Sequence, residues 1–222
     1  MTTWIRPAAL VVIAALMAAC QPMRTAPPAK GEIAFPASEY RTAAAAGQRV
    51  YDLIPGSSTL RVFVYRAGAL ARFGHDHVVV ASDFRGAVAW PSQEPGKARL
   101  DLVVPVDALK VDPPAVRRAL GGAFASELDR DAVEGTRENM LGAQVLDAER
   151  FPRVGIHLVG VEGGLPRPIL KLAVSLRGSQ KTVSVPVAVA MDGDKLQASG
   201  RLVLRQSDFG MEPFSALGGA LT

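Results

Sequence analysis

The sequence predicts a mainly β fold: an antiparallel barrel with one or two short helices inserted into it. The first observation is that apolar and polar residues alternate, most clearly over residues 168–178 and 182–191. The second is that short turns separate such runs, at Gly163-Gly164, Gly178–Lys181 and Asp192-Gly193-Asp194. Several evenly spaced strands joined by short turns favour a closed or nearly closed antiparallel barrel over a parallel sheet.

The composition indicates one globular domain with short appendages. The chain has 222 residues, of which 49% are hydrophobic and 21% charged. Its formal net charge is +4, but the basic residues are scattered, and only Lys171, Arg177 and Lys181 come close to forming a patch. We therefore expect a solvated surface and no nucleic-acid partner.

Residues 1–19 have the pattern of a signal peptide. One basic residue, Arg6, precedes an apolar run from Ala8 to Ala19 that is too short to span a bilayer comfortably and has no charged stop after it. The run ends in Leu16-Met17-Ala18-Ala19-Cys20, which resembles the lipobox of bacterial lipoproteins. We expect Cys20 to be lipidated and to anchor the protein to a membrane.

The residue after the cysteine is Gln21 rather than Asp, and the sorting pattern of such lipoproteins then favours the periplasmic face of the outer membrane. Cys20 is the only cysteine, so an intramolecular disulfide is impossible.

Residues 20–47 are rich in proline and lack an apolar period, which predicts a flexible tether in which Ala43–Ala46 could form a helical turn. The folded domain is expected over residues 48–222.

The domain should begin with strands at Arg49–Leu53 and Ser58–Arg66, on either side of a turn at Pro55-Gly56. A strand containing the apolar run Val78–Val80 follows, and ends before a turn near Pro91. The remaining strands are expected at 99–106, 153–161, 168–178, 182–191 and 195–205. Helical spacing instead of alternation predicts one or two short helices, in the segments from Pro113-Pro114 to Leu120 and over 129–141.

Two of the three histidines, His75 and His77, stand one residue apart before an apolar run. In a strand, residues i and i+2 share a face, so both imidazoles would point one way and Asp76 the other. They could cap the strand end through hydrogen bonds. Alternatively they could supply two ligands of a metal site, with His157 as the third.

Catalytic motifs are not found. Ser82, Asp83 and the His-Asp-His cluster are the available reactive groups, but the sequence has no Gly-x-Ser-x-Gly, phosphate loop or dinucleotide fingerprint. We expect a protein that is not an enzyme and needs no cofactor.

Several short segments together resemble the YceI-like family over roughly residues 48–218. The segment Gly74-His75-Asp76-His77, followed by Phe84-Arg85-Gly86, carries the resemblance. Five others fall in the family's order: residues 51–58, 139–141, 150–152, 176–178 and 206–211. The resemblance implies a lipocalin-like barrel that binds long apolar, polyisoprenoid-type molecules in the bacterial envelope as a carrier, store or sensor. It implies no known reaction.

The alternating apolar rows alone leave open whether they fill a packed core or line a ligand lumen. The resemblance favours the lumen, with the lipid contacted by Val62, Val64, Leu102, Val104, Ile156, Leu158, Leu172, Val174, Val185 and Val187. One alternative is an envelope interaction protein with a packed barrel. Relatives usually continue into one more strand after the 206–211 segment, so an edge left open near Thr222 could recruit a partner strand or a second copy. A second alternative to the lipid-binding barrel is a metal-binding variant that uses His75 and His77.

The lipobox-like end of the apolar run leads to a direct test. Replacing Cys20 with Ala should abolish acylation and move the protein out of the membrane fraction, as measured by mass spectrometry of the mature N-terminal peptide and by cell fractionation. Wild-type protein that is soluble and carries no lipid would contradict the anchor.

Overall fold

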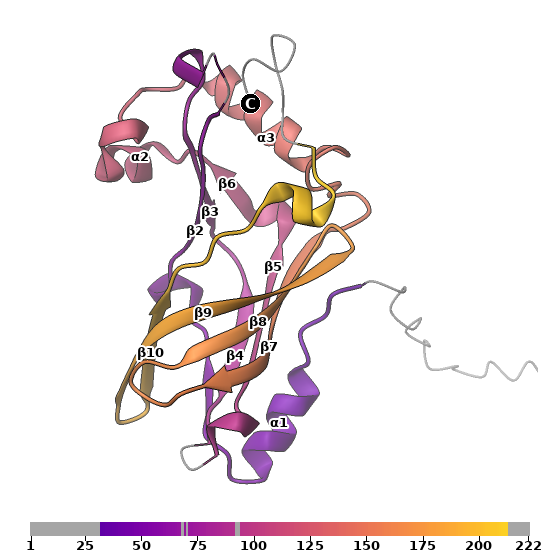
Figure 1. The fold of residues 1–222 in the computed structure, drawn as a ribbon, viewed down its shortest axis with the longest axis vertical. Helices are drawn as coiled ribbons and strands as arrows, with labels where there is room; N and C mark the ends of the chain where they lie inside the picture. The colour runs from indigo at the N-terminus through magenta and orange to yellow at the C-terminus, as the bar shows by residue number, and fades with distance from the viewer. Residues whose placement is uncertain (1–31, 68, 70, 92–93, 213–222) are drawn as a thin grey trace, which may run out of the picture.

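Seven antiparallel strands form a nearly closed barrel, and three more form a second sheet, in the computed structural model, which describes residues 32–67, 69, 71–91 and 94–212 (Figure 1). Seven strands form one sheet in the order β1-β4-β5-β7-β8-β9-β10, and three form a second, β2-β3-β6. The strands are β1 (Val50–Asp52), β2 (Leu60–Val64), β3 (His77–Ala81), β4 (Arg85–Ala89), β5 (Arg99–Pro105), β6 (Leu109–Val111), β7 (Arg153–Glu162), β8 (Ile169–Leu176), β9 (Ser179–Asp192) and β10 (Lys195–Gly200). The predicted fold class is confirmed.

The two sheets arise because three long runs of chain bend. Residues 50–64 pair with 77–89, through Val50↔Ala89 in β1–β4 and Leu60↔Ala81 in β2–β3. Residues 77–89 pair in turn with 99–111 through β5 and β6. Each run changes direction at an interruption, such as the 3-10 turn Pro55–Ser57 in the first. The sequence predicted the break in the first run at Pro55-Gly56 and a strand over 99–106, but not the separate strands β4 and β6.

The later strands follow the predicted meander, and their apolar rows face one another inside the barrel. Leu170 lies opposite Val185, and Leu172 lies opposite Val183. Together with Val88 and Trp90 from the first hairpins they form the main apolar cluster. The last predicted strand, 195–205, ends at Gly200, beyond which residues 201–205 have no strand pairing with the described residues.

Helices occupy both ends of the molecule (Figure 1). Helix α2 (Pro114–Leu120) and helix α3 (Arg130–Leu141), both predicted, lie at the end that carries β2, β3 and β6. Helix α1 (Ala37–Ala45) lies against the outside of the main sheet.

One end of the barrel interior is closed by an apolar end plug, which we define as Met140, Leu146, Phe209 and Met211. These side chains pack on Val174 of β8, and Phe209 is only 1% exposed. The guanidinium of Arg177, in the β8–β9 turn, holds the plug by donating to the carbonyl oxygens of Gly210 and Ala143.

Residues 32–47 differ from the predicted flexible tether, because they pack along the outer wall. Tyr40 of α1 is 5% exposed, and its hydroxyl lies 3.0 Å from the carbonyl oxygen of Ala87 and 2.8 Å from Oδ2 of Asp101. Burial, together with the carboxylate of Asp101, raises the pKa of Tyr40 well above its usual range, so the hydroxyl remains a donor. We call residues 32–47 the N-terminal strap.

The predicted signal peptide, Cys20 and residues 20–31 lie outside the described residues. Within the described part of the chain, no helix is long and apolar enough to cross a membrane.

Phe209 provides a test of the end plug. Phe209→Ala should lower the free energy of unfolding by about 3–5 kcal/mol, because it leaves a cavity among side chains that cannot close over it. Val203→Ala, six residues earlier at a side chain that is 83% exposed, should change it by less than about 0.5 kcal/mol. Urea denaturation of both variants gives the comparison, and equal effects would show that the plug is not packed as described.

Candidate functional site

The predicted lumen residues differ widely in exposure. Six are between 2% and 8% exposed: Val104, Leu158, Leu172, Val174, Val185 and Val187. Val64, Leu102 and Ile156 are partly buried, whereas Val62 is 50% exposed. The buried six pack against neighbouring apolar side chains, so a ligand would enter by separating those contacts.

The interior face continues from the main sheet onto the three-stranded sheet. Residues opposite each other in an antiparallel pair share a face, and the register pairs Val62 with Val79 and Val64 with His77. Val79 in turn lies opposite Val111 of β6. The apolar face therefore ends, at this end of the sheet, in the imidazole of His77.

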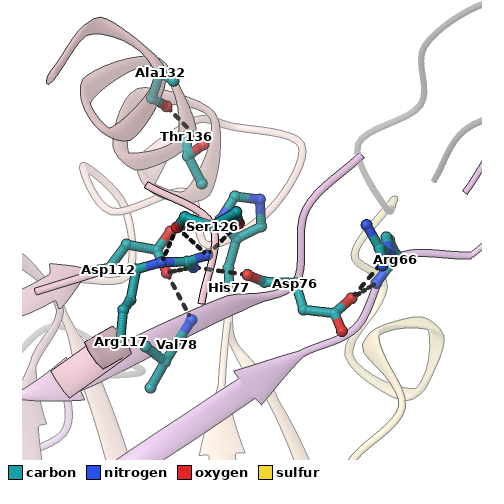
Figure 2. Close-up of polar contacts among 9 residues, drawn as sticks. All are labelled: Arg66, Asp76, His77, Val78, Asp112, Arg117, Ser126, Ala132 and Thr136. Carbon is teal, nitrogen blue, oxygen red and sulfur yellow. Dashed lines mark hydrogen bonds and ion pairs between the residues drawn. The ribbon is translucent and has the colours of Figure 1, made fainter. Parts of the chain in front are cut away.

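A buried carboxylate fixes that imidazole. Asp112, directly after β6, is 2% exposed and adopts a positive φ of 48°. Its Oδ2 lies 2.6 Å from Nδ1 of His77, and its Oδ1 accepts the backbone N–H of Val78 at 2.9 Å (Figure 2). Asp112 thus joins the end of β6 to the start of β3.

Arg117 of α2 completes the network and is itself only 4% exposed. Its Nη1 donates to Oδ1 of Asp112 at 2.6 Å and to the carbonyl oxygen of Asp76 at 2.8 Å, while Nη2 donates to Oγ of Ser126 at 2.9 Å (Figure 2). The guanidinium also lies 5.9 Å from the ring centroid of Phe124. We call Asp112, Arg117, His77, Asp76 and Ser126 the His77 network.

The electrostatics of the network favour an ionised Asp112. Burial alone would raise the pKa of its carboxyl, but hydrogen bonds from His77, the Val78 amide and Arg117 outweigh burial and lower the pKa below its usual value. Asp112 is therefore a carboxylate facing Arg117, and the two opposite charges balance.

His75 does not share this position, contrary to the expected i, i+2 pair. Strand β3 begins only at His77, so the period of two does not extend back to His75, which is exposed. Asp76, expected to turn away, is instead 7% exposed, and its Oδ1 accepts the backbone N–H of Arg66 at 3.0 Å. The strand-end hydrogen bonding that was one interpretation of the cluster is seen at His77 and Asp76.

His157 is not brought to the pair. It lies on β7 with a side chain that is 51% exposed, and its Nδ1 lies 2.6 Å from Oδ1 of Asp101, the carboxylate that also binds Tyr40 of the N-terminal strap. Among the residues that the structure describes, no three His, Cys, Asp or Glu side chains are grouped so that they could hold a metal ion. Metal binding by His75 and His77 stays a prediction, but His157 does not supply the third ligand.

Asp112, Arg117 and Ser126 were missed by the sequence reasoning. Asp112 stands directly before Pro113-Pro114, which was used only as a helix start. A buried arginine has no sequence signature distinct from an exposed one, so Arg117 could be recognised only from the fold.

These features define the class: a small antiparallel β-barrel protein with an apolar interior and a buried polar network at one end. The sequence profile of the YceI-like domain matches residues 51–221, and the chain belongs to the YceI-like family. Proteins of this family are in general binding proteins rather than enzymes.

Several solved structures resemble the chain. BcnA of Burkholderia cenocepacia aligns with a TM-score of 0.52 at 14% sequence identity, over 72% of this chain and 85% of BcnA. The YCEI protein of Campylobacter jejuni aligns with a TM-score of 0.44 at 11% identity, over 60% of this chain and 70% of that one. At such low identities the likeness to BcnA supports the fold alone. No curated protein matches the chain in sequence.

The lowered pKa of Asp112 predicts a specific pH dependence. Because the folded-state pKa lies below the unfolded value, the stabilisation is fully present above the ordinary Asp pKa of about 4 and is lost as the pH falls through the folded value. The wild-type free energy of unfolding should therefore fall from about pH 4 downward.

The variant Asp112→Asn should be less stable at neutral pH by about 3–5 kcal/mol, because Arg117 is left as an unpaired buried charge. It should also lose the part of the acid dependence that Asp112 supplies. Asp83→Asn, at an exposed carboxylate, is the control and should leave both quantities nearly unchanged. Urea denaturation between pH 3 and 7 gives the curves, and parallel curves for wild type and Asp112→Asn would contradict the assignment.

Proposed function

We propose that this protein is an envelope lipoprotein whose barrel binds a long apolar molecule of the polyisoprenoid type, as a carrier, store or sensor, without catalysing a reaction. The observation that carries the proposal is the continuous apolar face inside a nearly closed barrel, from Leu172 and Val185 in the main sheet to Val79 and Val111 in the smaller one. Membership of a family of binding proteins supports it.

The energetics favour a long ligand. Burying apolar surface contributes about 25 cal/mol per Å², whereas immobilising the ligand and separating packed side chains oppose binding. A chain of several isoprene units buries enough surface to offset both terms, and a short one does not. The interior should therefore discriminate by length and shape, not by charge.

A lipid at Cys20 would keep the barrel near the membrane. Only residues 21–31 separate Cys20 from the first described residue of the N-terminal strap. Twelve residue steps span at most about 40 Å when fully extended. Such a distance suits transfer of an insoluble ligand between the outer membrane and the barrel.

The interior packing favours a second candidate, a non-enzymatic interaction protein with a closed core. Its basis is that Val174, Val185 and four further lumen positions are at most 8% exposed. Strand β2 pairs only with β3 among the described strands, and its other edge could pair with a partner strand or a second copy. Lipid extraction separates the two functions, because the first predicts a co-purifying lipid.

Substitutions inside the barrel test the lipid-binding function. Val174→Asp or Val185→Asp should abolish lipid retention, because each places a carboxylate on the apolar interior face. Ser184→Asp is the matched control, since Ser184 neighbours Val185 in β9 but is exposed and lies opposite Lys171 on the other face. Retained lipid is measured by mass spectrometry of organic extracts from domain purified without detergent.

Circular dichroism must first show that each variant is folded, because a buried Asp can itself unfold a barrel. If the folded wild-type domain carries no lipid and binds no added polyprenoid, the lipid-binding function is wrong and the interaction function takes its place.

A further inference from the structure

We propose that His77 contacts the polar end of the bound ligand and selects molecules that end in a hydroxyl group. This inference rests on the proposed lipid-binding function and adds the chemistry of the ligand's head group. Within the His77 network, the imidazole of His77 is partly accessible and is aligned with the apolar interior face.

The position of His77 follows from the register of the smaller sheet. Val111 and Val79 are 6% and 5% exposed, whereas Val62, opposite Val79, is 50% exposed. The next pair along this face is Val64 and His77, and the His77 side chain is 24% exposed. An elongated apolar molecule lying along this face would reach His77 where the face opens towards solvent.

The orientation of the ring is fixed. The carboxylate of Asp112 can only accept a hydrogen bond, so Nδ1 of His77, at 2.6 Å from it, must carry the proton. In the neutral ring Nε2 then carries the lone pair. Nε2 has no hydrogen bond from any residue within the described ranges, so it remains available to a ligand.

The charge balance around the ring decides which head group fits. Asp112 is paired with Arg117, and Asp76 lies 3.6 Å from Nε of Arg66, so each carboxylate near His77 has its own guanidinium. The network therefore presents no surplus positive charge for a phosphate. A neutral imidazole with its lone pair outward accepts a hydrogen bond, which a hydroxyl can donate and an ether or carbonyl oxygen cannot.

Rigidity makes this contact selective. Hydrogen bonds from the Val78 amide and from Arg117 hold Asp112, and a third, from Nδ1 of His77, fixes the ring to it, which sets the direction of Nε2. A ligand that places an acceptor at Nε2 would leave two unpaired acceptors facing each other. The expected discrimination is that of a single hydrogen bond, about fivefold to tenfold in affinity.

The experiment compares three probes of one chain length: geranylgeraniol, its methyl ether and its phosphate monoester. Binding is measured by titration with the folded wild-type domain, and the ring nitrogens are observed by ¹⁵N NMR. With only three histidines the spectrum can be assigned, and His157 serves as an internal control because its Nδ1 is held by Asp101 at the same 2.6 Å on the outer wall.

We expect the alcohol to bind about fivefold to tenfold more tightly than the ether, and to shift the His77 Nε2 resonance while leaving His157 unchanged. The variant His77→Phe should bind alcohol and ether alike. The wild-type spectra test the contact even if that variant fails to fold.

Two results would overturn the inference alone: equal binding of alcohol and ether with His77 unshifted, or tighter binding of the phosphate than of the alcohol. If no probe binds the folded domain, the proposed lipid-binding function fails together with the inference. The outcomes therefore separate an error about the head group from an error about the ligand class.

Discussion

The buried carboxylate of Asp112 is the constraint on which one whole end of this molecule depends. It accepts hydrogen bonds from the ring of His77 and the backbone N–H of Val78, both in β3, and from Arg117 of α2, so it links these two elements to the end of β6. A charge that is 2% exposed is tolerated only because all of these donors are in place. The same contacts that neutralise Asp112 also set the position of α2 and the direction in which His77 presents its free nitrogen.

Much of the fold could be predicted because alternation is a local property of strands. In the rows through Leu172 and Val185, every second residue is apolar, so a few residues suffice to identify the inward face. The structure pairs the two rows on one side of the sheet. The bend in the first run was signalled by Pro55-Gly56, but the bends in the second and third runs were not predictable in the same way. Apolar and polar residues alternate in the same way before and after a bend, so alternation does not reveal where a strand leaves one sheet for another. The segment around Val106, between β5 and β6, was therefore predicted as the end of one strand followed by a loop.

The site was less predictable, because it depends on contacts between residues that are distant in sequence. The histidine pair was read with the period of a strand, but β3 begins only at His77, and Arg117 lies 41 residues from Asp76, whose carbonyl oxygen it binds. The docking of the N-terminal strap on the outer wall was unpredictable for the same reason. The alanine-rich N-terminal strap has no apolar period, yet Tyr40 is buried and binds the carboxylate of Asp101, and Glu32 and Glu39 pair with Arg153 and Arg99.

The meander also has a consequence for the order of assembly. Among the described strands, five of the eight pairings join strands that are consecutive along the chain, and contacts of such low sequence separation can form before the distant ones. The contacts of higher sequence separation are the pairings β1–β4, β3–β6 and β5–β7, the strap, whose Tyr40 reaches Asp101, and the plug, whose Phe209 packs with Val106. We expect the hairpins to form first and the two ends of the described chain to be fastened last, so Phe209 seals an interior that the rest of the chain has already enclosed.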